Sequence, residues 1–454
     1  MLEVIVLAAG RGTRMRSSLP KVLHPLAGKP LIKHVLDTAR RVAAHNIHVV
    51  VGHGAEIVCQ EIAANDVTTY VQSEQLGTGH ATLAAAPHCQ PDSTVIVLFG
   101  DVPMLSEETL SRVIAAAKSG PALLAASMRD PNGYGRVIRN SAGAFVRVVE
   151  QKDAGPEVLS VQEVNTGVLA ANARALTDWL SRVTNDNAQG EYYLPDVLGL
   201  AVEDGCSVEV VVTEDEIETQ GVNDRVQLEA LERSLQLRKA EELMASGVTL
   251  SDKHRFDLRG QLDCAEDVSI DINVVIEGEV RIGKGSVIEP NCVLKDCTIG
   301  DGAVIRAFSH VEGASVGAEC QVGPYARLRP GAELSAKAKV GNFVEVKNSR
   351  FGEGAKANHL AYVGDADVGA GSNIGAGTIT CNYDGVNKHR TELGDKVFIG
   401  SNSTLVAPLS VEDNGFVAAG STVTSNVGEG ELAVGRAKQR NIKGWKRPTK
   451  RGGK

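Results

Sequence analysis

The sequence has no apolar stretch near the roughly 18 residues that a membrane-spanning helix requires. Its first ten residues carry Glu3 inside their apolar run and have no basic segment, so they do not fit a secretory signal peptide. Positive charge is also limited, because 47 Lys and Arg stand against 56 Asp and Glu. The net charge of −9 disfavours DNA or RNA as the main partner. We therefore expect a cytoplasmic protein without membrane insertion.

Cysteine is scarce and widely spaced. The chain has no CxxC pair, and the closest two cysteines, Cys292 and Cys297, are separated by five positions in a segment with its own period. This spacing predicts neither a zinc site nor a disulfide framework. The thiols are interpreted as small buried hydrophobes or isolated surface groups; the remaining six are Cys59, Cys89, Cys206, Cys264, Cys320 and Cys381.

The chain is too long for one ordinary hydrophobic core. At about 100–200 residues per domain, 454 residues suggest roughly two to four domains. A content of 43% hydrophobic and 23% charged residues argues against disorder. Half of the 48 glycines fall within residues 271–430, so that region needs an explanation of its own.

Apolar residues recur every six positions through the glycine-rich region. A helix cannot use this period, because six residues rotate its face by about 600°, whereas short strands joined at corners can. We expect three hexads to form a triangular coil of about eighteen residues, and stacked coils to bury one apolar prism. The alternative, a β-sandwich with chance spacing, does not account for so long a run. The inward positions, interrupted at 381–392, are Ile276, Ile282, Ile288, Leu294, Ile299, Ile305, Val311, Val316, Val322, Leu328, Leu334, Val340, Val346, Phe351, Ala357, Val363, Val368, Ile374, Thr380, Leu393, Ile399, Leu405, Val411, Val417 and Val423.

The N-terminal half alternates strand-like and helix-like segments instead. Apolar runs at residues 3–8, 48–51 and 94–99 predict strands, and residues 31–43 have an amphipathic helical pattern. This alternation is typical of an α/β domain with a mainly parallel sheet.

Three segments follow from these patterns. Residues 1–226 are expected to form the α/β domain, and the charged helical pattern after them predicts a linker helix at 227–250. Residues 251–454 would form the repeat domain, whose tail is basic and contains no acid beyond Arg436.

Small residues follow the first predicted strand in the run Leu7-Ala8-Ala9-Gly10-Arg11-Gly12-Thr13-Arg14-Met15, with Lys21 close behind. Such residues let the backbone approach a ligand, and N–H groups at this place suit phosphates. The dinucleotide loop GxGxxG is absent because Met15 occupies its last glycine position, and the phosphate loop GxxxxGK[ST] is absent as well.

The run resembles the signature of sugar-phosphate nucleotidyltransferases. Together with the hexads, the match covers nearly the whole chain and resembles the family of bifunctional bacterial enzymes that are both glucosamine-1-phosphate N-acetyltransferase and N-acetylglucosamine-1-phosphate uridyltransferase. The implied fold is a Rossmann-like α/β nucleotidyltransferase domain followed by a left-handed parallel β-helix. Phe99 is tyrosine in some relatives. The resemblance continues at Gln72, at Gln75-Leu76-Gly77-Thr78-Gly79, at Phe99-Gly100-Asp101-Val102-Pro103, at Gly133-Tyr134-Gly135-Arg136, at Val149-Glu150, at Glu163-Val164-Asn165-Thr166-Gly167 and at Gly221-Val222-Asn223.

The resemblance implies a role for each matching residue of the first site. Asp101 and Asn223 would ligate Mg²⁺, a hard ion that suits oxygen donors, while Arg14 and Lys21 would neutralise the UTP triphosphate. The remaining positions implied for UTP or the nucleotide sugar are Leu7, Ala8, Ala9, Gly10, Gln72, Gly77, Thr78, Phe99 and Gly100, with Gly135, Glu150 and Asn165 at the sugar.

Polar residues interrupt the hexads at spacings that place them on adjacent coils. Two cations, a phenol, an amide and an imidazole would suit a sugar-phosphate pocket; they are Arg329, Lys347, His359, Tyr362 and Asn373. The resemblance makes His359 the general base, because imidazole titrates near neutral pH. Arg329 and Lys347 would then bind the sugar phosphate, with Tyr362 and Asn373 orienting the sugar. Acetyl-CoA would lie along Ala376, Asn382, Tyr383, Ser401, Ala419 and Arg436.

The implied activity is synthesis of UDP-N-acetylglucosamine, a precursor of bacterial cell-surface glycans such as peptidoglycan and lipopolysaccharide. Two alternatives remain: a single-activity nucleotidyltransferase whose β-helix is regulatory or oligomerising, and a non-catalytic nucleotide-sugar sensor. We also expect a homotrimer, because a flat prism face that carries active-site residues needs a further surface to complete the site. The loop at 381–392 is too long for a corner and would reach a neighbouring chain.

Overall fold

The computed structural model describes residues 1–450, and the chain divides into two compact units, Met1–Leu237 and Arg238–Lys454. The helix α8 (Arg225–Ala245) contributes residues to both units. Among the described residues, no helix combines the length and apolar character needed to cross a bilayer.

The N-terminal unit is built on one twisted sheet in the order β11-β7-β10-β6-β1-β4-β5. Along this order the pairings are parallel except at β10, which is antiparallel to both β6 and β7; the side strands β8 and β9 are also antiparallel to each other. The expected mainly parallel α/β sheet is therefore confirmed. The strands are β1 (Leu2–Ala8), β4 (Asn46–Val51), β5 (Val67–Val71), β6 (Thr94–Phe99), β7 (Ala122–Ser127), β10 (Glu163–Asn172) and β11 (Glu209–Thr213), with β8 (Arg136–Arg139) and β9 (Phe145–Val149) at one side and the small pair β2 (Pro25–Leu26) and β3 (Lys29–Pro30) apart.

Helices cover both faces of this sheet because its strands are apolar on both sides. Ile5 and Leu7 of β1 pack with apolar residues of α3 and α6, whereas Val4 and Val6 pack with residues of α1 and α4. The helices are α1 (Leu31–Arg41), α2 (Ala55–Ile62), α3 (Thr78–Ala85), α4 (Glu107–Ala116), α5 (Pro156–Leu159), α6 (Ala173–Arg182) and α7 (Asp196–Glu203).

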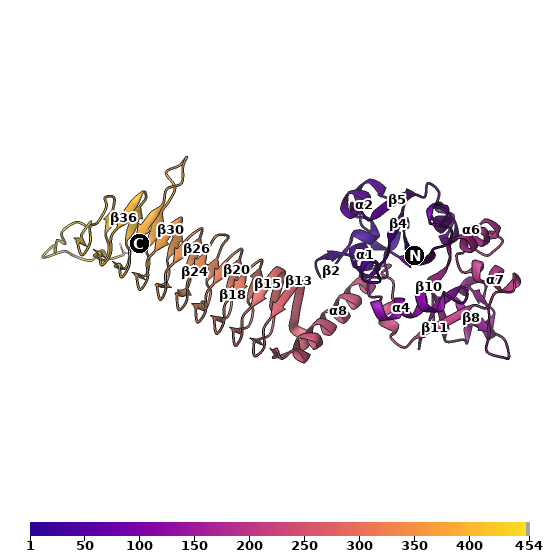
Figure 1. Ribbon diagram of the computed structural model, residues 1–454. Helices are drawn as coiled ribbons and strands as arrows, with labels where there is room; N and C mark the ends of the chain where they lie inside the picture. The colour runs from indigo at the N-terminus through magenta and orange to yellow at the C-terminus, as the bar shows by residue number, and fades with distance from the viewer. Residues whose placement is uncertain (451–454) are drawn as a thin grey trace. The chain divides into compact units, whose positions relative to one another are not determined.

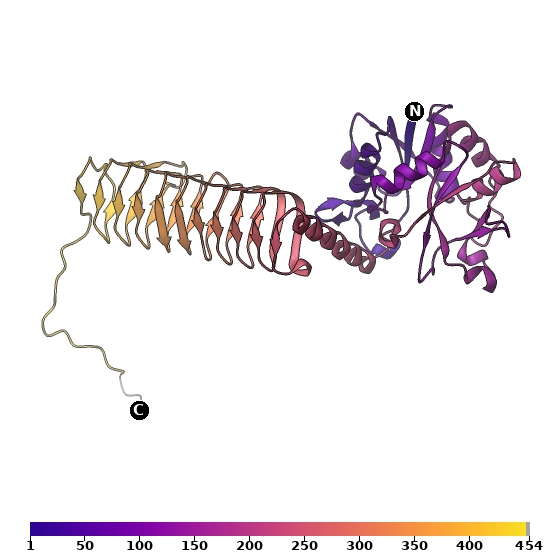
Figure 2. The same cartoon turned by 60° about the horizontal axis from the view of Figure 1, so that its bottom comes forward.

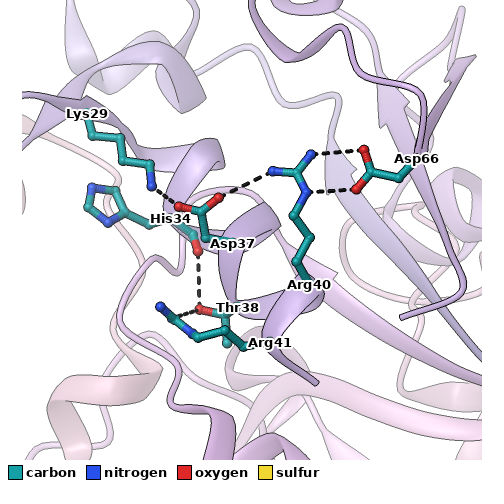
Figure 3. Close-up of polar contacts among 7 residues, drawn as sticks. All are labelled: Lys29, His34, Asp37, Thr38, Arg40, Arg41 and Asp66. Atoms are coloured by element: carbon teal, nitrogen blue, oxygen red, sulfur yellow. Dashed lines mark hydrogen bonds and ion pairs between the residues drawn. The ribbon is translucent and has the colours of Figure 1, made fainter. Parts of the chain in front are cut away.

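A network of ion pairs links α1 to neighbouring segments of the chain (Figure 3). Asp37 pairs with Lys29 of β3 and, at 3.3 Å, with Arg40 one turn further along the helix. Arg40 also forms a bidentate salt bridge with Asp66, just before β5. Its Nε and Nη2 donate to the two carboxylate oxygens at 2.7 and 3.1 Å. Since these side chains are partly exposed, the pairs orient the helix more than they stabilise it.

The C-terminal unit is a stack of triangular coils, seen as successive rungs in Figure 1. Parallel pairing joins Val275 to Val293, Val293 to His310 and His310 to Arg327, so these coils take seventeen or eighteen residues. The step from Asp367 to Glu392 takes 25, because that coil carries the projecting loop. Every hexad position named above is buried, none more than 5% exposed. The predicted period, coil length and apolar prism are confirmed, as expected for a left-handed parallel β-helix.

The strands form three columns, one for each side of the prism. The long strands β13 (Phe256–Cys264) and β15 (Val274–Ile282) bend across the second and third columns. The first column holds β12 (Thr249–Leu250), β14 (Ser269–Ile270), β16 (Val287–Ile288), β19 (Val304–Ile305), β22 (Gln321–Val322), β25 (Lys339–Asn342), β28 (Lys356–His359), β31 (Asn373–Ile374), β34 (Phe398–Ile399), β37 (Phe416–Val417) and β39 (Leu432–Ala433). The second holds β17 (Val293–Lys295), β20 (His310–Glu312), β23 (Arg327–Leu328), β26 (Glu345–Lys347), β29 (Tyr362–Gly364), β32 (Ile379–Cys381), β35 (Thr404–Val406) and β38 (Thr422–Val423). The third holds β18 (Thr298–Ile299), β21 (Ser315–Val316), β24 (Glu333–Leu334), β27 (Arg350–Phe351), β30 (Ala366–Val368), β33 (Thr391–Leu393) and β36 (Leu409–Val411).

Two segments leave the stack. The loop between β32 and β33 projects as a short hairpin closed by a bridge between Tyr383 and Lys388 (Figure 1, orange to yellow). From Val434 to Lys450 the described chain has neither helix nor strand; Gly435 and Arg436 still contact the last coil, and the end of the segment runs away from it (Figure 2).

Candidate active sites

A cavity of about 230 Å³ opens at the carboxyl ends of β1 and β6. In a doubly covered parallel sheet, ligands bind at this edge. Gly100 lies behind the cavity, where its N–H donates to the Leu7 carbonyl at 2.9 Å. Ten residues predicted from the sequence line it: Leu7, Ala8, Ala9, Gly10, Lys21, Gln72, Gly77, Thr78, Phe99 and Asp101.

The segment around Tyr192 covers the start of α3 beside this cavity. Gly77 has φ +115°, and a Cβ there would lie 2.5 Å from the Tyr192 carbonyl oxygen, so only glycine fits. Gly79 donates its N–H to the same carbonyl at 2.8 Å, and the Thr78 hydroxyl accepts the Leu194 N–H at 3.1 Å. These contacts hold the N-terminal amides of α3 at the cavity, where they suit an anionic or polar ligand.

Two cations and two oxygen donors meet beside the cavity. Lys21 Nζ pairs with Asp101 Oδ2 and lies 3.4 Å from Asn223 Oδ1. Arg14 Nη2 donates to the same Asn223 oxygen at 2.9 Å. The structure thus joins residues that lie 80 and 202 positions from Lys21 in the sequence.

The oxygens of Asp101 and Asn223 fit a small divalent cation. Both point at one ammonium group, so a single positive charge already occupies the space between them. A carboxylate and an amide carbonyl are hard donors, and so few protein ligands leave room for substrate phosphates.

The residues predicted to contact the sugar form a second cluster. Asn165 N–H donates to the Gly135 carbonyl at 2.8 Å, and a Cβ on Gly135 would lie 2.8 Å from Glu150 Oε1. Burial raises the pKa of Glu150, and the charges of Asp196 and Asp153 raise it further. Burial, followed by Asp153, raises the pKa of Asp196 to about 6.

Four cavity residues were absent from the predicted site, and one of them is Val22. Gln75 and Glu191 line the cavity with Ala81 of α3. Gln75 was visible in the motif at 75–79, whereas Glu191 lies in an irregular segment that offers no local pattern.

His359 lies at the end of β28, on the corner between the first and second columns. Its Nδ1 is 2.7 Å from Oδ1 of Asn342, the paired residue on the preceding coil. An amide oxygen only accepts hydrogen bonds, so Nδ1 must carry the proton. The exposed imidazole therefore presents a basic Nε2.

The predicted sugar-phosphate residues lie on or directly after strands of the first and second columns. Lys347 on β26 and Tyr362 on β29 belong to adjacent strands of the second column. Arg329 Nη1 reaches the same column through Glu345 Oε1, at 2.9 Å. Asn373 lies on β31 of the first column.

Asn382 is held by a buried acid at the base of the projecting loop. Asp365 accepts hydrogen bonds from the side-chain amides of Asn348, at 2.5 Å, and Asn382. Burial alone would raise the pKa of Asp365, but these two bonds lower it below its ordinary value. Tyr383 is exposed, and its hydroxyl donates to the Gly385 carbonyl at 2.6 Å.

The other residues predicted for acetyl-CoA follow the His359 corner from coil to coil. Gly377 donates its N–H to the Leu360 carbonyl, Asn402 to Ala376 and Gly420 to Ser401, at 2.7–3.0 Å. Arg436 reaches the same edge through the Ala419 carbonyl. Ser401, Ala419 and Arg436 are exposed, so this edge is open to solvent.

The same corner carries an exposed apolar stripe on the earlier coils. The rings of Phe308, Tyr325 and Phe343 stack in sequence, with centroids 4.9 and 5.4 Å apart, and Leu360 continues the line beside His359. All four residues have left-handed backbones, and each is about half exposed or more. Such a stripe is typical of a surface covered by another chain.

Comparison with known proteins relates both units to described families. The family model of the MobA-like NTP transferase domain matches residues 4–246, and that of the GMPPB C-terminal domain matches residues 258–348. Over 99% of its length the chain is 54% identical to the bifunctional protein GlmU of Pseudomonas entomophila (strain L48), covering 99% of that protein. The corresponding values are 55%, 99% and 100% for the GlmU of Stutzerimonas stutzeri (strain A1501). For that of Idiomarina loihiensis they are 53%, 100% and 99%.

Proposed function

The chain belongs to the GlmU family, and from this premise we propose how its two units divide the synthesis of UDP-N-acetylglucosamine. The enzyme transfers an acetyl group from acetyl-CoA to glucosamine 1-phosphate, and then a uridylyl group from UTP to the product, releasing pyrophosphate. We assign uridylyl transfer to residues 1–226, acetyl transfer to residues 251–454 and a linking role to residues 227–250.

The cavity at β1 and β6 would hold the nucleotide. Leu7 to Gly10, Gln72, Gly77 and Thr78 would bind uracil and ribose, and Gly135, Glu150 and Asn165 would bind the sugar. The sugar phosphate oxygen attacks the α-phosphorus of UTP as the bond to pyrophosphate breaks. Arg14 and Lys21 would neutralise the charge on the phosphates, which is what such transfers need most.

Asp101 and Asn223 would hold a divalent cation, which we assign as Mg²⁺ because both donors are hard oxygens. When bound, the ion supplies positive charge to the phosphate oxygens. Lys21 contacts both oxygens in the described structure, so it would turn toward the phosphates as the substrate enters.

In the second unit, His359 would act as the general base. Its Nε2 takes a proton from the glucosamine amine as the nitrogen attacks the thioester carbonyl carbon, the carbon–sulfur bond breaks, and CoA leaves as thiolate. Arg329 and Lys347 would bind the sugar phosphate, with Tyr362 and Asn373 orienting the ring. Acetyl-CoA would follow the open edge from Ala376, past Asn382 and Tyr383, to Ser401, Ala419 and Arg436.

The hydrogen bond from His359 to Asn342 is the observation that supports a catalytic rather than purely structural β-helix. This hydrogen bond leaves Nε2 free to accept a proton on an exposed edge. A β-helix with only a regulatory or oligomerising role does not need such a group. The test is a paired assay of CoA thiol release and pyrophosphate release on one purified preparation. If the folded wild-type protein lacked either activity, the assignment would be contradicted.

We further propose a cytoplasmic homotrimer. The apolar stripe beside His359 supports it, because a second copy covering that corner would turn an open edge into a pocket. Light scattering should then give about three times 47.8 kDa. Residues 1–226 alone should be monomeric and still release pyrophosphate. Phe343→Glu should dissociate the assembly, whereas Val287→Glu, an exposed substitution in the first column, should leave it intact.

Shared sites can be tested by mixing chains. If His359 and Arg436 of one acetyl-transfer site come from different chains, His359→Ala and Arg436→Ala proteins should regain part of the activity when combined. A monomer with full acetyl transfer would rule the trimer out.

A further inference from the structure

A second group of metal-binding side chains lies at the amino-terminal end of the central sheet, away from the nucleotide cavity. Glu3 is the second residue of β1, His48 lies on the neighbouring strand β4, and Cys89 follows the turn at Ala86–His88. One ligand atom from each side chain lies within 4.8 Å of the others. The residues are 1%, 5% and 6% exposed. The spacing of the cysteines along the sequence gives no sign of this group, because its members come from distant segments.

One ring nitrogen of His48 has no hydrogen-bond partner among the described residues. Its buried Nε2 makes no hydrogen bond within the described chain. Glu3 Oε2 is 3.7 Å away, which is too far for a direct hydrogen bond. Ligand bonds of about 2.0–2.1 Å in a tetrahedral zinc site place oxygen and nitrogen roughly 3.3 Å apart, so only a small movement would bring both onto one ion.

Surrounding residues hold these donors in place. The Tyr70 hydroxyl is 3.0 Å from His48 Nδ1, so Nε2 is the nitrogen left facing Glu3. Asn46 Nδ2 donates to Glu3 Oε1 at 3.1 Å, and the Gln90 N–H donates to Oε2 at 2.9 Å. Partners of this kind orient metal ligands in known sites.

We propose that Glu3, His48 and Cys89 bind one divalent cation of the zinc class. A mixed set of sulfur, nitrogen and oxygen suits zinc and disfavours Mg²⁺ or Ca²⁺, which prefer oxygen alone. A carboxylate and a thiolate cancel the charge of the ion, so the buried complex would be neutral. The ion would link β1, β4 and the segment that carries Cys89.

The test is a titration of the metal-free, full-length protein with Zn²⁺ against a chelator of known affinity, with Cd²⁺ as a parallel optical probe. The expected result is one thiolate-bound ion per chain with a thiolate–metal ultraviolet band. Cys89→Ser should abolish the band and weaken binding about 10²-fold or more. Cys206→Ser, a half-buried thiol of the same unit, is the matched control.

Two further measurements separate this site from the magnesium site and from misfolding. Asp101→Ala should keep the thiolate–metal band, because it removes a donor of the other site only. Zn²⁺ should raise the Tm of the wild type by several degrees and leave that of His48→Gln unchanged. Absence of a saturable band in the wild-type protein, or its persistence in Cys89→Ser, would overturn the proposal.

Discussion

The two units differ in where their candidate site residues lie, in a cavity in one unit and on an exposed edge in the other. In the N-terminal unit, strand ends and the covering segment at Tyr192 enclose a cavity. In the C-terminal unit, His359, Ser401 and Arg436 follow one another along an exposed edge. A twisted parallel sheet creates a crevice where its strands end, whereas a β-helix offers flat sides and straight corners. This difference is consistent with the proposal that the first site lies within one chain and that the second is completed by a neighbouring chain.

The largest expected effect is the separation of the two activities. His359→Ala should lower acetyl transfer by about 10²–10⁴-fold, the usual cost of a lost general base, and leave uridylyl transfer near the wild-type rate. Asp101→Ala should do the reverse. Both rates are measured on each variant, with circular dichroism as the control for folding. If either substitution abolished both reactions in a folded protein, the division between units would be wrong.

Chelation of divalent cations should also separate the two activities. EDTA should stop pyrophosphate release, because it would remove the cation that we propose Asp101 and Asn223 hold, and should leave CoA release intact. Adding back excess Mg²⁺ should restore the first reaction. Equal inhibition of both reactions while the protein remains folded would contradict a metal-independent second site.

A smaller effect tests how the exposed histidine is oriented. Asn342→Ala should reduce acetyl transfer about 10–10²-fold, because it removes the acceptor for His359 Nδ1. Asn342→Asp keeps an acceptor and should retain more activity. Its carboxylate favours the imidazolium form and should move the acidic limb of the kcat/KM profile to higher pH. Identical pH profiles for the two variants would show that Asn342 does not orient the imidazole.

The smallest effect concerns pH and the stability of the N-terminal unit. Asp196 ionises near pH 6 in the folded chain, against an ordinary value of 3.8, so stability falls as pH rises from about 4 to 6. Asp196→Asn removes this cost and should raise the unfolding free energy at pH 8 by about 1 kcal/mol, after allowance for partial exposure. Denaturant curves at pH 8 and pH 4 check this, and the gain should vanish at pH 4. A gain of equal size at both pH values would assign it to something other than ionisation.

Much of the fold was predictable because its signals are local. The hexad positions from Ile276 to Val423 are buried as expected, since a period of six fits only short strands between corners. The predicted strands at 3–8, 48–51 and 94–99 correspond to β1, β4 and β6, and the helix expected at 31–43 ends at Arg41. The antiparallel strand β10 had no such signal, because strand direction depends on the sheet around it.

The candidate sites were predictable only where they lie within motifs. Leu7 to Gly10, Gly77 and Thr78 border one cavity, as their motifs indicated. Glu191 did not stand out, since an irregular segment has no period. The contact of Asn342 with His359 was also missed, although a seventeen-residue step along the coils would have indicated it.

By itself, the sequence determined the two periodicities, the positions of the corners and the apolar residues that fill each core, because these depend on neighbours a few residues apart. Only the tertiary structure decided which distant side chains meet. Lys21 reaches Asp101 and Asn223, and Glu3 meets His48 and Cys89, because β1 lies between β4 and β6 in the sheet. Strand order and register follow from burying the apolar surface of the whole unit, and no local pattern contains that information.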